Sequence, residues 1–301
     1  MSNKKYYLGW LMAFIAVSLF STKAIIVKLI YQVQDIDAIT TVALRMIFSF
    51  PIFIIIALKT WKPLTKKQVY QIIIAGFLGY YAASLLDFIA LKYISSSLER
   101  LILFLNPGIV LILSWIFFKH KINKFQCLSL ILGYISVFIV FMHESLNGSN
   151  IVLGVILAFA SVVSYALYVI LCSSLLKTME AIRLTSLATC IASILCIAQF
   201  YIIEPSPNQI LLSLPFKIYW LSAINALFCT VIPVLLTMLA IQSCGPGITS
   251  QTGIIGPMIT IFLGAALLNE KLTIYHAVGT FGVILSMIIL SKGIIVEKAK
   301  T

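Results

Sequence analysis

Long, largely apolar stretches recur along the whole chain and are separated by short polar connectors. Ten of these stretches are about 20 residues long, which is the length a helix needs to cross the hydrocarbon core of a bilayer. They cover residues 8–30, 39–58, 70–91, 98–118, 125–143, 151–173, 182–203, 218–241, 247–268 and 274–291. The pattern predicts an all-α integral membrane protein with ten transmembrane helices and little chain outside the membrane.

The composition leads to the same class of protein. Of the 301 residues, 61% are hydrophobic and 10% are charged, and the mean hydropathy is +1.11, which leaves too little polar surface to cover a water-soluble globule. The net charge of +12 comes from lysines and arginines in short connectors, so it indicates membrane topology rather than nucleic-acid binding. The six cysteines form no CxxC pair and lie mostly in apolar stretches, so neither a metal nor a cofactor is expected.

The lysines and arginines favour one orientation in the membrane. If the N-terminus is cytoplasmic, fourteen of them fall on the cytoplasmic side and four on the opposite side, and cytoplasmic loops are the ones that carry the excess of positive charge. We therefore expect both termini in the cytoplasm of a bacterium and the chain in its cytoplasmic membrane. The first stretch follows Lys4 and Lys5 as a signal peptide would, but it has no A-x-A cleavage site and is interpreted as a retained first helix.

The two halves of the chain are weakly similar to one another. At an offset of 150 residues, LDFIALK (86–92) aligns with LTMLAIQ (236–242), and Pro107 aligns with Pro257. We therefore expect two repeats, 1–146 and 147–301, within one transmembrane domain. Each repeat has five spans, and an odd number places the two repeats in opposite orientations. Inverted repeats of this kind are typical of secondary transporters.

Several segments resemble the EamA-like branch of the drug/metabolite transporter superfamily. The second half contains GPMITIFLGAALLNEKLTIYHAVGTFG (256–282), in which Pro257, Glu270 and Gly279 take the places of that family's pattern. The segments ALKYISSSLERLILFLNP (90–107) and ALRMIF (43–48) are similar to further parts of it. The resemblance implies a carrier, but its motifs occur in carriers of unrelated solutes. It also implies a cavity lined by helices 1, 3, 4, 6, 8 and 9, with Lys23, Tyr81, Asn106, Tyr165, Thr230 and Gln251 as candidate substrate-binding residues.

Ionisable residues within the expected helices are candidates for function, because a charge at a helix centre costs roughly 2.5–3.5 kcal/mol. Lys23 in the first helix is expected to line a polar cavity, with a structural ion pair as the alternative. Arg45 is interpreted first as an anchor between helices, with Asp87 or Glu99 as its partner. Both carboxylates lie near the ends of expected helices, so proton coupling is the less favoured hypothesis, with Asp87 as its best candidate.

Prolines and deep aromatic residues add further candidates. Pro107 and Pro257 each remove a backbone hydrogen bond at matching places in helices 4 and 9. Paired breaks of this kind point to a central binding site, although a packing kink would give the same pattern. A buried hydroxyl or indole N–H needs a partner, so about half of the deep aromatic residues are expected to line the cavity. This aromatic group consists of Tyr80, Tyr81, Trp115, Tyr165 and Tyr168.

Taken with the resemblance, these features favour a secondary transporter that moves a small metabolite by alternating access. A membrane-embedded cation, tyrosines and neutral amides suit a solute with an apolar part and a carboxylate, and an amino acid exported from the cytoplasm is the first choice. A multidrug exporter is the alternative among carriers, and a membrane enzyme or scaffold is the alternative of another class. No catalytic motif points to an enzyme. The expected partners are the solute and the lipid bilayer, without nucleic acid, and a homodimer is left open.

Overall fold

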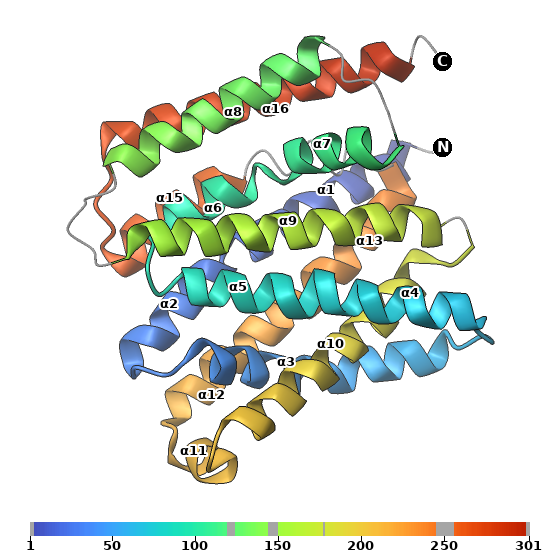
Figure 1. The fold of residues 1–301 in the computed structure, drawn as a ribbon, viewed down its shortest axis with the longest axis vertical. Coiled ribbons are helices and arrows are strands. Elements are labelled where there is room, and N and C mark those ends of the chain that lie inside the picture. The colour runs from blue at the N-terminus through green and yellow to red at the C-terminus, as the bar shows by residue number, and fades with distance from the viewer. Residues whose placement is uncertain (1–2, 119–123, 144–149, 177, 245–255, 299–301) are drawn as a thin grey trace.

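The computed structural model describes residues 3–118, 124–143, 150–176, 178–244 and 256–298. Within these ranges every regular element is a helix, and most of the helices run roughly along one direction (Figure 1). Six described segments are long and apolar enough to cross a bilayer, namely Tyr7–Val33, Ala38–Lys59, Lys66–Ala90, Ile151–Cys172, Ala181–Ile203 and Phe216–Thr237. The chain is therefore a multi-pass membrane protein. The expectation of ten spans goes beyond these six, since the apolar helices Cys127–Val140, Gly256–Leu268 and Ile274–Ser286 are shorter.

The helices of the two halves follow one another through short connections. The first half contains α1 (Asn3–Ser21), α2 (Lys23–Val33), α3 (Ala38–Lys59), α4 (Lys66–Gly76), the π-helical turn η1 (Phe77–Ala82), α5 (Ala83–Ala90), α6 (Ser96–Leu103), α7 (Asn106–Phe118) and α8 (Lys124–His143). The second half contains α9 (Ile151–Leu175), α10 (Ala181–Ile203), α11 (Pro207–Ser213), α12 (Phe216–Ala226), the π-helical turn η2 (Leu227–Val231), α13 (Ile232–Cys244), α15 (Gly256–Leu268) and α16 (Ile274–Lys298).

Local sequence signals explain where several helices begin. The Asp37 carboxylate accepts a hydrogen bond of 2.7 Å from the Thr40 amide at the start of α3. Thr65 and Gln68 form a capping box at the start of α4, and the Ser95 hydroxyl accepts from the Leu98 amide at the start of α6. Each cap satisfies an amide that has no partner within its helix.

The first span is broken at Thr22, between α1 and α2. The hydroxyls of Ser18, Ser21 and Thr22 donate to main-chain carbonyls three or four residues earlier, a pattern that bends helices because it competes with the backbone ladder. Lys23 is the first residue after this break. The sequence SLFSTK therefore both bends the first span and places a cation at the bend.

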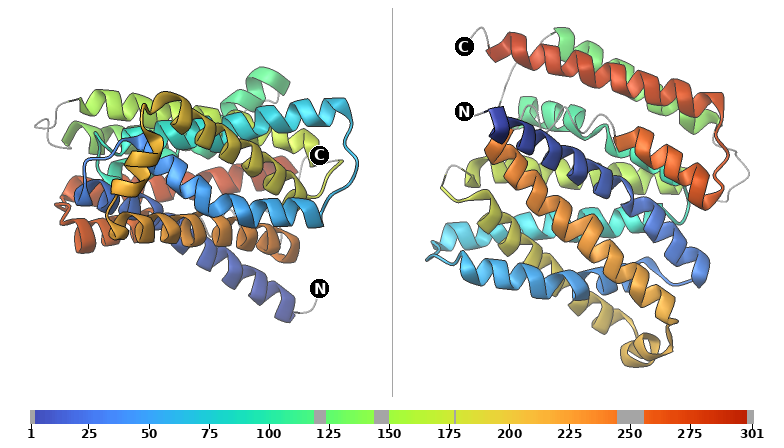
Figure 2. Two further views of the ribbon diagram at one scale, coloured as in Figure 1. Left: turned by 90° about the horizontal axis from the view of Figure 1, so that it is seen from below. Right: turned by 180° about the vertical axis from the view of Figure 1, so that it is seen from behind.

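The main helix contacts join the two halves of the chain. Helix α1 packs on α13, α3 on α10, α5 on α9, α6 on α15 and α8 on α16. The pair α8 and α16 lies along one edge of the bundle, next to each other in both views that show this edge (Figures 1 and 2). Neither half forms its main packing surfaces alone, so the bundle is one folded unit.

Two π-helical turns interrupt long helices at equivalent places. Turn η1 begins at Phe77 and η2 begins at Leu227, which is the offset of 150 residues that relates the two halves in sequence. A π turn inserts an extra residue into a helix, opens its hydrogen-bond ladder, and is found frequently at functional sites. The two turns therefore direct attention to the space between the helices that carry them.

Candidate functional site

A cavity of about 310 Å³ lies between the two halves and is partly open. Its apolar wall comes mainly from α1, α6, α9 and α13, for example Phe20, Leu103, Val162 and Val234. Its charged groups are Lys23 on α2, Arg45 on α3, Asp87 on α5 and Arg100 on α6. Its neutral polar groups are Tyr80, Ser84, Asn106, Ser161, Tyr165 and Thr230.

Lys23 and two carboxylates form an ion cluster on one side of this cavity. The Lys23 ammonium nitrogen lies 2.6 Å from Asp87 Oδ2 and 3.7 Å from Glu99 Oε1. The side chains of Asp87 and Glu99 are 3% and 1% exposed, whereas that of Lys23 is 17% exposed. Removing such groups from water is costly unless they are paired, so the cluster fixes α2, α5 and α6 against one another.

Two arginines line the cavity without a carboxylate partner among the described residues. Arg45 is 5% exposed, and its Nε and Nη2 have no hydrogen-bond partner there. Its guanidinium carbon lies 4.8 Å from the centre of the Phe88 ring. The sequence predicts Asp87 or Glu99 as the partner of Arg45, but both carboxylates pair with Lys23 instead. Arg100 donates from Nη2 to the Ser21 hydroxyl at 3.0 Å, and its Nε has no partner.

The π turns place polar side chains of both halves on the cavity. Gly79 and Tyr80 on η1 line it, and so do Cys229 and Thr230 at the equivalent positions of η2. Hydroxyls of α9 hold the opened backbone near η1, because Ser164 donates to the Leu78 carbonyl at 2.8 Å and Ser161 donates to that of Ala83 at 2.7 Å. At η2 the Thr230 hydroxyl donates to the Asn225 carbonyl at 3.3 Å.

Most of the residues singled out in the sequence fall on or next to this cavity. The cavity is lined by Lys23, Arg45, Tyr80, Asp87, Asn106, Tyr165 and Thr230. Glu99 lies next to the cavity and pairs with Lys23. Pro107 is the second residue of α7 and follows the break between α6 and α7, while Pro257 is the second residue of α15. The first turn of a helix does not use its amides, so at these positions the prolines remove no hydrogen bond from α7 or α15, contrary to the expectation from the sequence.

Three aromatic candidates lie elsewhere. Trp115 on α7 is 54% exposed on the outside of the bundle, where an indole ring meets lipid. Tyr81 packs against Phe77, with ring centres 5.3 Å apart, and against the core between α2, α3 and α5. Tyr168 is buried behind the cavity wall, and its hydroxyl donates to that of Tyr80 at 3.3 Å. Gln251 lies outside the described residues.

Sequence reasoning missed Arg100 as a cavity residue. Arg100 lies near the start of the fourth expected span, where a cation normally faces the water at the membrane surface, but α6 turns it inward to the cavity. A Cβ on Gly256 would lie 2.8 Å from Arg100 Nη2, so the glycine leaves room for the guanidinium. The segment GP at 256–257 was a visible signal for close packing, although it did not reveal the packed partner.

Glu270 ties the second half to the first half at one end of the bundle. Its Oε1 accepts from the amide and the hydroxyl of Ser96, both at 2.9 Å, and its Oε2 accepts from the Ser97 hydroxyl at 3.0 Å. A carboxylate at the N-terminus of α6 also interacts favourably with the helix dipole. Glu270 thus caps a helix of the other half.

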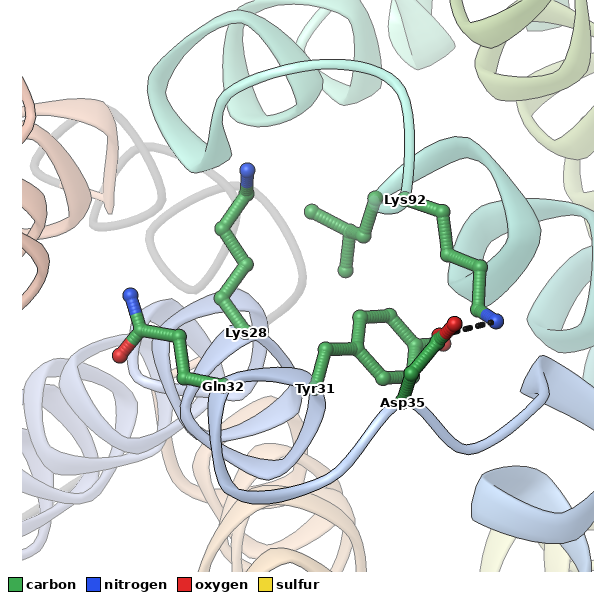
Figure 3. Close-up of a pocket in the computed structure, with 6 residues that line it drawn as sticks. Lys28, Tyr31, Gln32, Asp35 and Lys92 are labelled. Carbon is green, nitrogen blue, oxygen red and sulfur yellow. Dashed lines mark hydrogen bonds and ion pairs between the residues drawn. The ribbon is translucent and has the colours of Figure 1, made fainter.

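A second hollow of about 330 Å³ lies further along α2 and α5, towards the end of the bundle that contains Glu270. Lys28, Tyr31, Gln32, Asp35 and Lys92 line it, and Lys92 pairs with Asp35 at 3.5 Å (Figure 3). The Lys28 ammonium lies 4.0 Å from Glu270 Oε1. This hollow is open and its lysines face acidic neighbours, whereas the larger set of inward-facing polar groups belongs to the central cavity.

Two known proteins that are similar to this chain along most of its length are named as uncharacterized transporters. The chain is 27% identical over 286 residues to the uncharacterized transporter YcbK of Bacillus subtilis (strain 168), which covers 91% of this chain and 90% of that protein. It is 25% identical over 240 residues to the uncharacterized transporter YyaM of the same organism, covering 78% of this chain and 77% of that protein.

Comparisons with solved structures and with family models identify the fold and the family of this chain. A solved crystal structure matches with a TM-score of 0.67 over 97% of this chain and 99% of that one, at 14% identity, which shows the fold alone. The model of the EamA-like transporter family matches in two stretches, residues 7–142 and 152–292. Together these stretches cover most of the sequence. The chain belongs to the EamA-like transporter family, within the drug/metabolite transporter superfamily.

Proposed function

We propose that this transporter moves a small metabolite with a carboxylate group, an amino acid or a related compound, by alternating access through the central cavity, with export as its direction. The observation that carries the proposal is the cavity itself. It combines charged, polar and aromatic side chains from both halves in a space of about 310 Å³. Ligand sites are typically apolar pockets with a few placed polar groups, and this volume is at the small end of their range.

The size and the charges favour a metabolite over a bulky drug. Arg45 and Arg100 suit a carboxylate, because a guanidinium matches its geometry with two parallel hydrogen bonds. Phe20, Leu103 and Val162 offer apolar surface to the rest of the solute. A multidrug exporter is expected to accept lipophilic cations, and two cavity arginines disfavour them.

The arrangement of helices supports two inverted five-helix repeats with ten spans. The pairs α3 with α10 and α8 with α16 join equivalent helices of the two halves, and the π turns recur at an offset of 150 residues. The two stretches that match the family are separated at 143–151, which includes the proposed boundary between 146 and 147. In such a carrier the two repeats move against each other around a shared site.

The proposed orientation has both termini in the cytoplasm. The beginning of α1 and the end of α16 lie at the same end of the bundle (Figure 1). The connection between α3 and α4 lies at that end as well (Figure 1), and the sequence has a lysine on each side of it, Lys59 and Lys66. An excess of lysine at this end supports its assignment to the cytoplasmic side of a bacterial membrane.

Counterflow into proteoliposomes tests the proposal. Vesicles loaded with one unlabelled solute receive the same labelled solute outside, from a panel of amino acids, other carboxylates, nucleotide sugars and quaternary amines. We expect accumulation of a carboxylate compound with the wild type. Ser84→Trp fills the cavity and is expected to abolish accumulation, whereas Ile135→Trp, on an outward face of α8, is the matched control. Accumulation of quaternary amines alone, or of no solute, would contradict the proposal.

A further inference from the structure

The two cavity arginines are held so that their donors remain available. The Arg45 guanidinium carbon lies 4.8 Å from the Phe88 ring centre, and that of Arg100 lies 5.5 Å from the Phe104 ring centre. An arginine that stacks on a ring is fixed by one face, while its N–H groups point outward along the edge. In both arginines Nε lacks a partner among the described residues, and in Arg45 Nη2 does as well.

A buried N–H group without a hydrogen-bond partner lowers the stability of the folded protein. A buried donor without a hydrogen bond has lost its water and gained nothing in return. Arg45 is almost fully buried, so its unpaired Nε and Nη2 should be the most destabilising of these donors. An occupant that accepts hydrogen bonds from both arginines would remove this cost, and a carboxylate does so with the right shape.

Lys23 is not available for the same task. Its ammonium already faces Asp87 at 2.6 Å and Glu99 at 3.7 Å. These two carboxylates offset the charge of Lys23, so this ammonium adds no unpaired positive charge to the cavity. Arg45 and Arg100 have no carboxylate partner among the described residues, so they give the cavity an excess of positive charge that an anionic solute offsets.

Resting on the carrier function proposed above, we propose that the transported solute is a net anion and that its carboxylate binds between Arg45 and Arg100. Within the amino-acid-related compounds, this selects those whose amine is absent or blocked, such as simple or N-acylated acids, over zwitterions. The Lys23 cluster then serves to position helices and does not bind the carboxylate.

Thermal unfolding of the purified protein in detergent tests this inference. The probes are 4-methylpentanoate and 3-phenylpropanoate, their amides, and leucine and phenylalanine, which add an ammonium group to the same two skeletons. Sodium chloride and inorganic phosphate at equal concentration test for an unselective anion site. A ligand that binds the folded state raises the unfolding temperature by mass action.

The variants are Arg45→Met and Arg100→Met, with Arg183→Met as the control. Arg183 is also buried, but its guanidinium donates to the Lys62 carbonyl outside the cavity. We expect at least one carboxylate to stabilise the wild type more than its amide and its zwitterion. Both cavity variants should lose at least about tenfold in affinity for it, the loss of one charge-assisted hydrogen bond. Without ligand, Arg45→Met should melt no lower than the wild type, whereas Arg183→Met should melt lower and keep the wild-type response.

Several results overturn the inference. One is that amides, zwitterions, chloride or phosphate raise the unfolding temperature as much as the carboxylates do. Another is that neither carboxylate raises it. A third is that Arg45→Met and Arg100→Met keep the wild-type affinity for the carboxylate. Counterflow separates these from a failure of the proposed function. A wild type that exchanges a zwitterionic or neutral solute, with both arginine variants as active as the wild type, keeps the carrier and removes the anion site.

Discussion

Replacing Lys23 with methionine should destabilise the protein strongly. Methionine fills a similar volume but leaves Asp87 and Glu99, both almost fully buried, without their shared cation. Removing one partner of a buried ion pair costs about 3–5 kcal/mol, and we take about 3 kcal/mol because Lys23 itself is 17% exposed to the cavity. With an unfolding entropy of about 2.1 cal/mol/K per residue, the melting temperature of a chain of this size should fall by about 5 °C.

The assay is thermal unfolding in detergent, followed by the fluorescence of the four tryptophans. The triple variant Lys23→Met, Asp87→Asn, Glu99→Gln removes all three charges together and should regain most of the lost stability, because complete replacement of a buried ion cluster is often tolerated. A single variant that melts within about 1 °C of the wild type would show that Lys23 does not stabilise the two buried carboxylates. So would a triple variant that is no more stable than the single one.

Two further substitutions test contacts between the halves. Glu270→Ala removes three hydrogen bonds to Ser96 and Ser97 and should lower the free energy of unfolding by about 2 kcal/mol, as measured by thermal unfolding. Glu270→Gln should lose less stability, because it keeps one oxygen acceptor. Equal losses of stability in the two variants would contradict the role of the carboxylate. Gly279→Ala would place a Cβ 2.2 Å from Val140 Cγ2 and 3.0 Å from the Ser136 carbonyl, so it should force α8 and α16 apart at a cost of about 1–3 kcal/mol. Ala277→Leu on the exposed side of α16 is its control, and equal melting of the two variants would show that the close contact is unimportant.

The membrane class could be predicted from the sequence because bilayer thickness imposes a length on each apolar stretch. The break at Pro107 was also visible, since proline cannot continue a helix from its interior. The π turns were not, because FLGYYA (77–82) and LFCTV (227–231) contain no proline and read as ordinary apolar helix. Their opened backbone depends on contacts such as that between Ser164 and the Leu78 carbonyl, 86 residues apart.

The candidate site could be predicted in its residues but not in their partners. The sequence places Asp87 and Glu99 near helix ends, and the structure agrees, since Asp87 is three residues from the end of α5 and Glu99 is in the first turn of α6. What it could not show is that these two ends meet around Lys23. The contact between Lys23 and these two helix ends depends on the bend at Thr22. Because Asp87 and Glu99 pair with Lys23, neither forms the ion pair expected with Arg45.

Alternating access through the proposed cavity requires that it open to each side of the membrane in turn. Ser84 lines that cavity and is half-buried, so a Ser84→Cys variant can report access through a membrane-impermeant thiol reagent. The wild type, whose Cys229 is buried in the cavity wall, measures the background. In right-side-out and inside-out vesicles, we expect labelling of Ser84→Cys above background from both faces. Glu270→Ala should shift the balance between the faces, because Glu270 joins the two halves at one end of the bundle. Labelling from one face only, in the presence and in the absence of a transported solute, would contradict alternating access through this cavity.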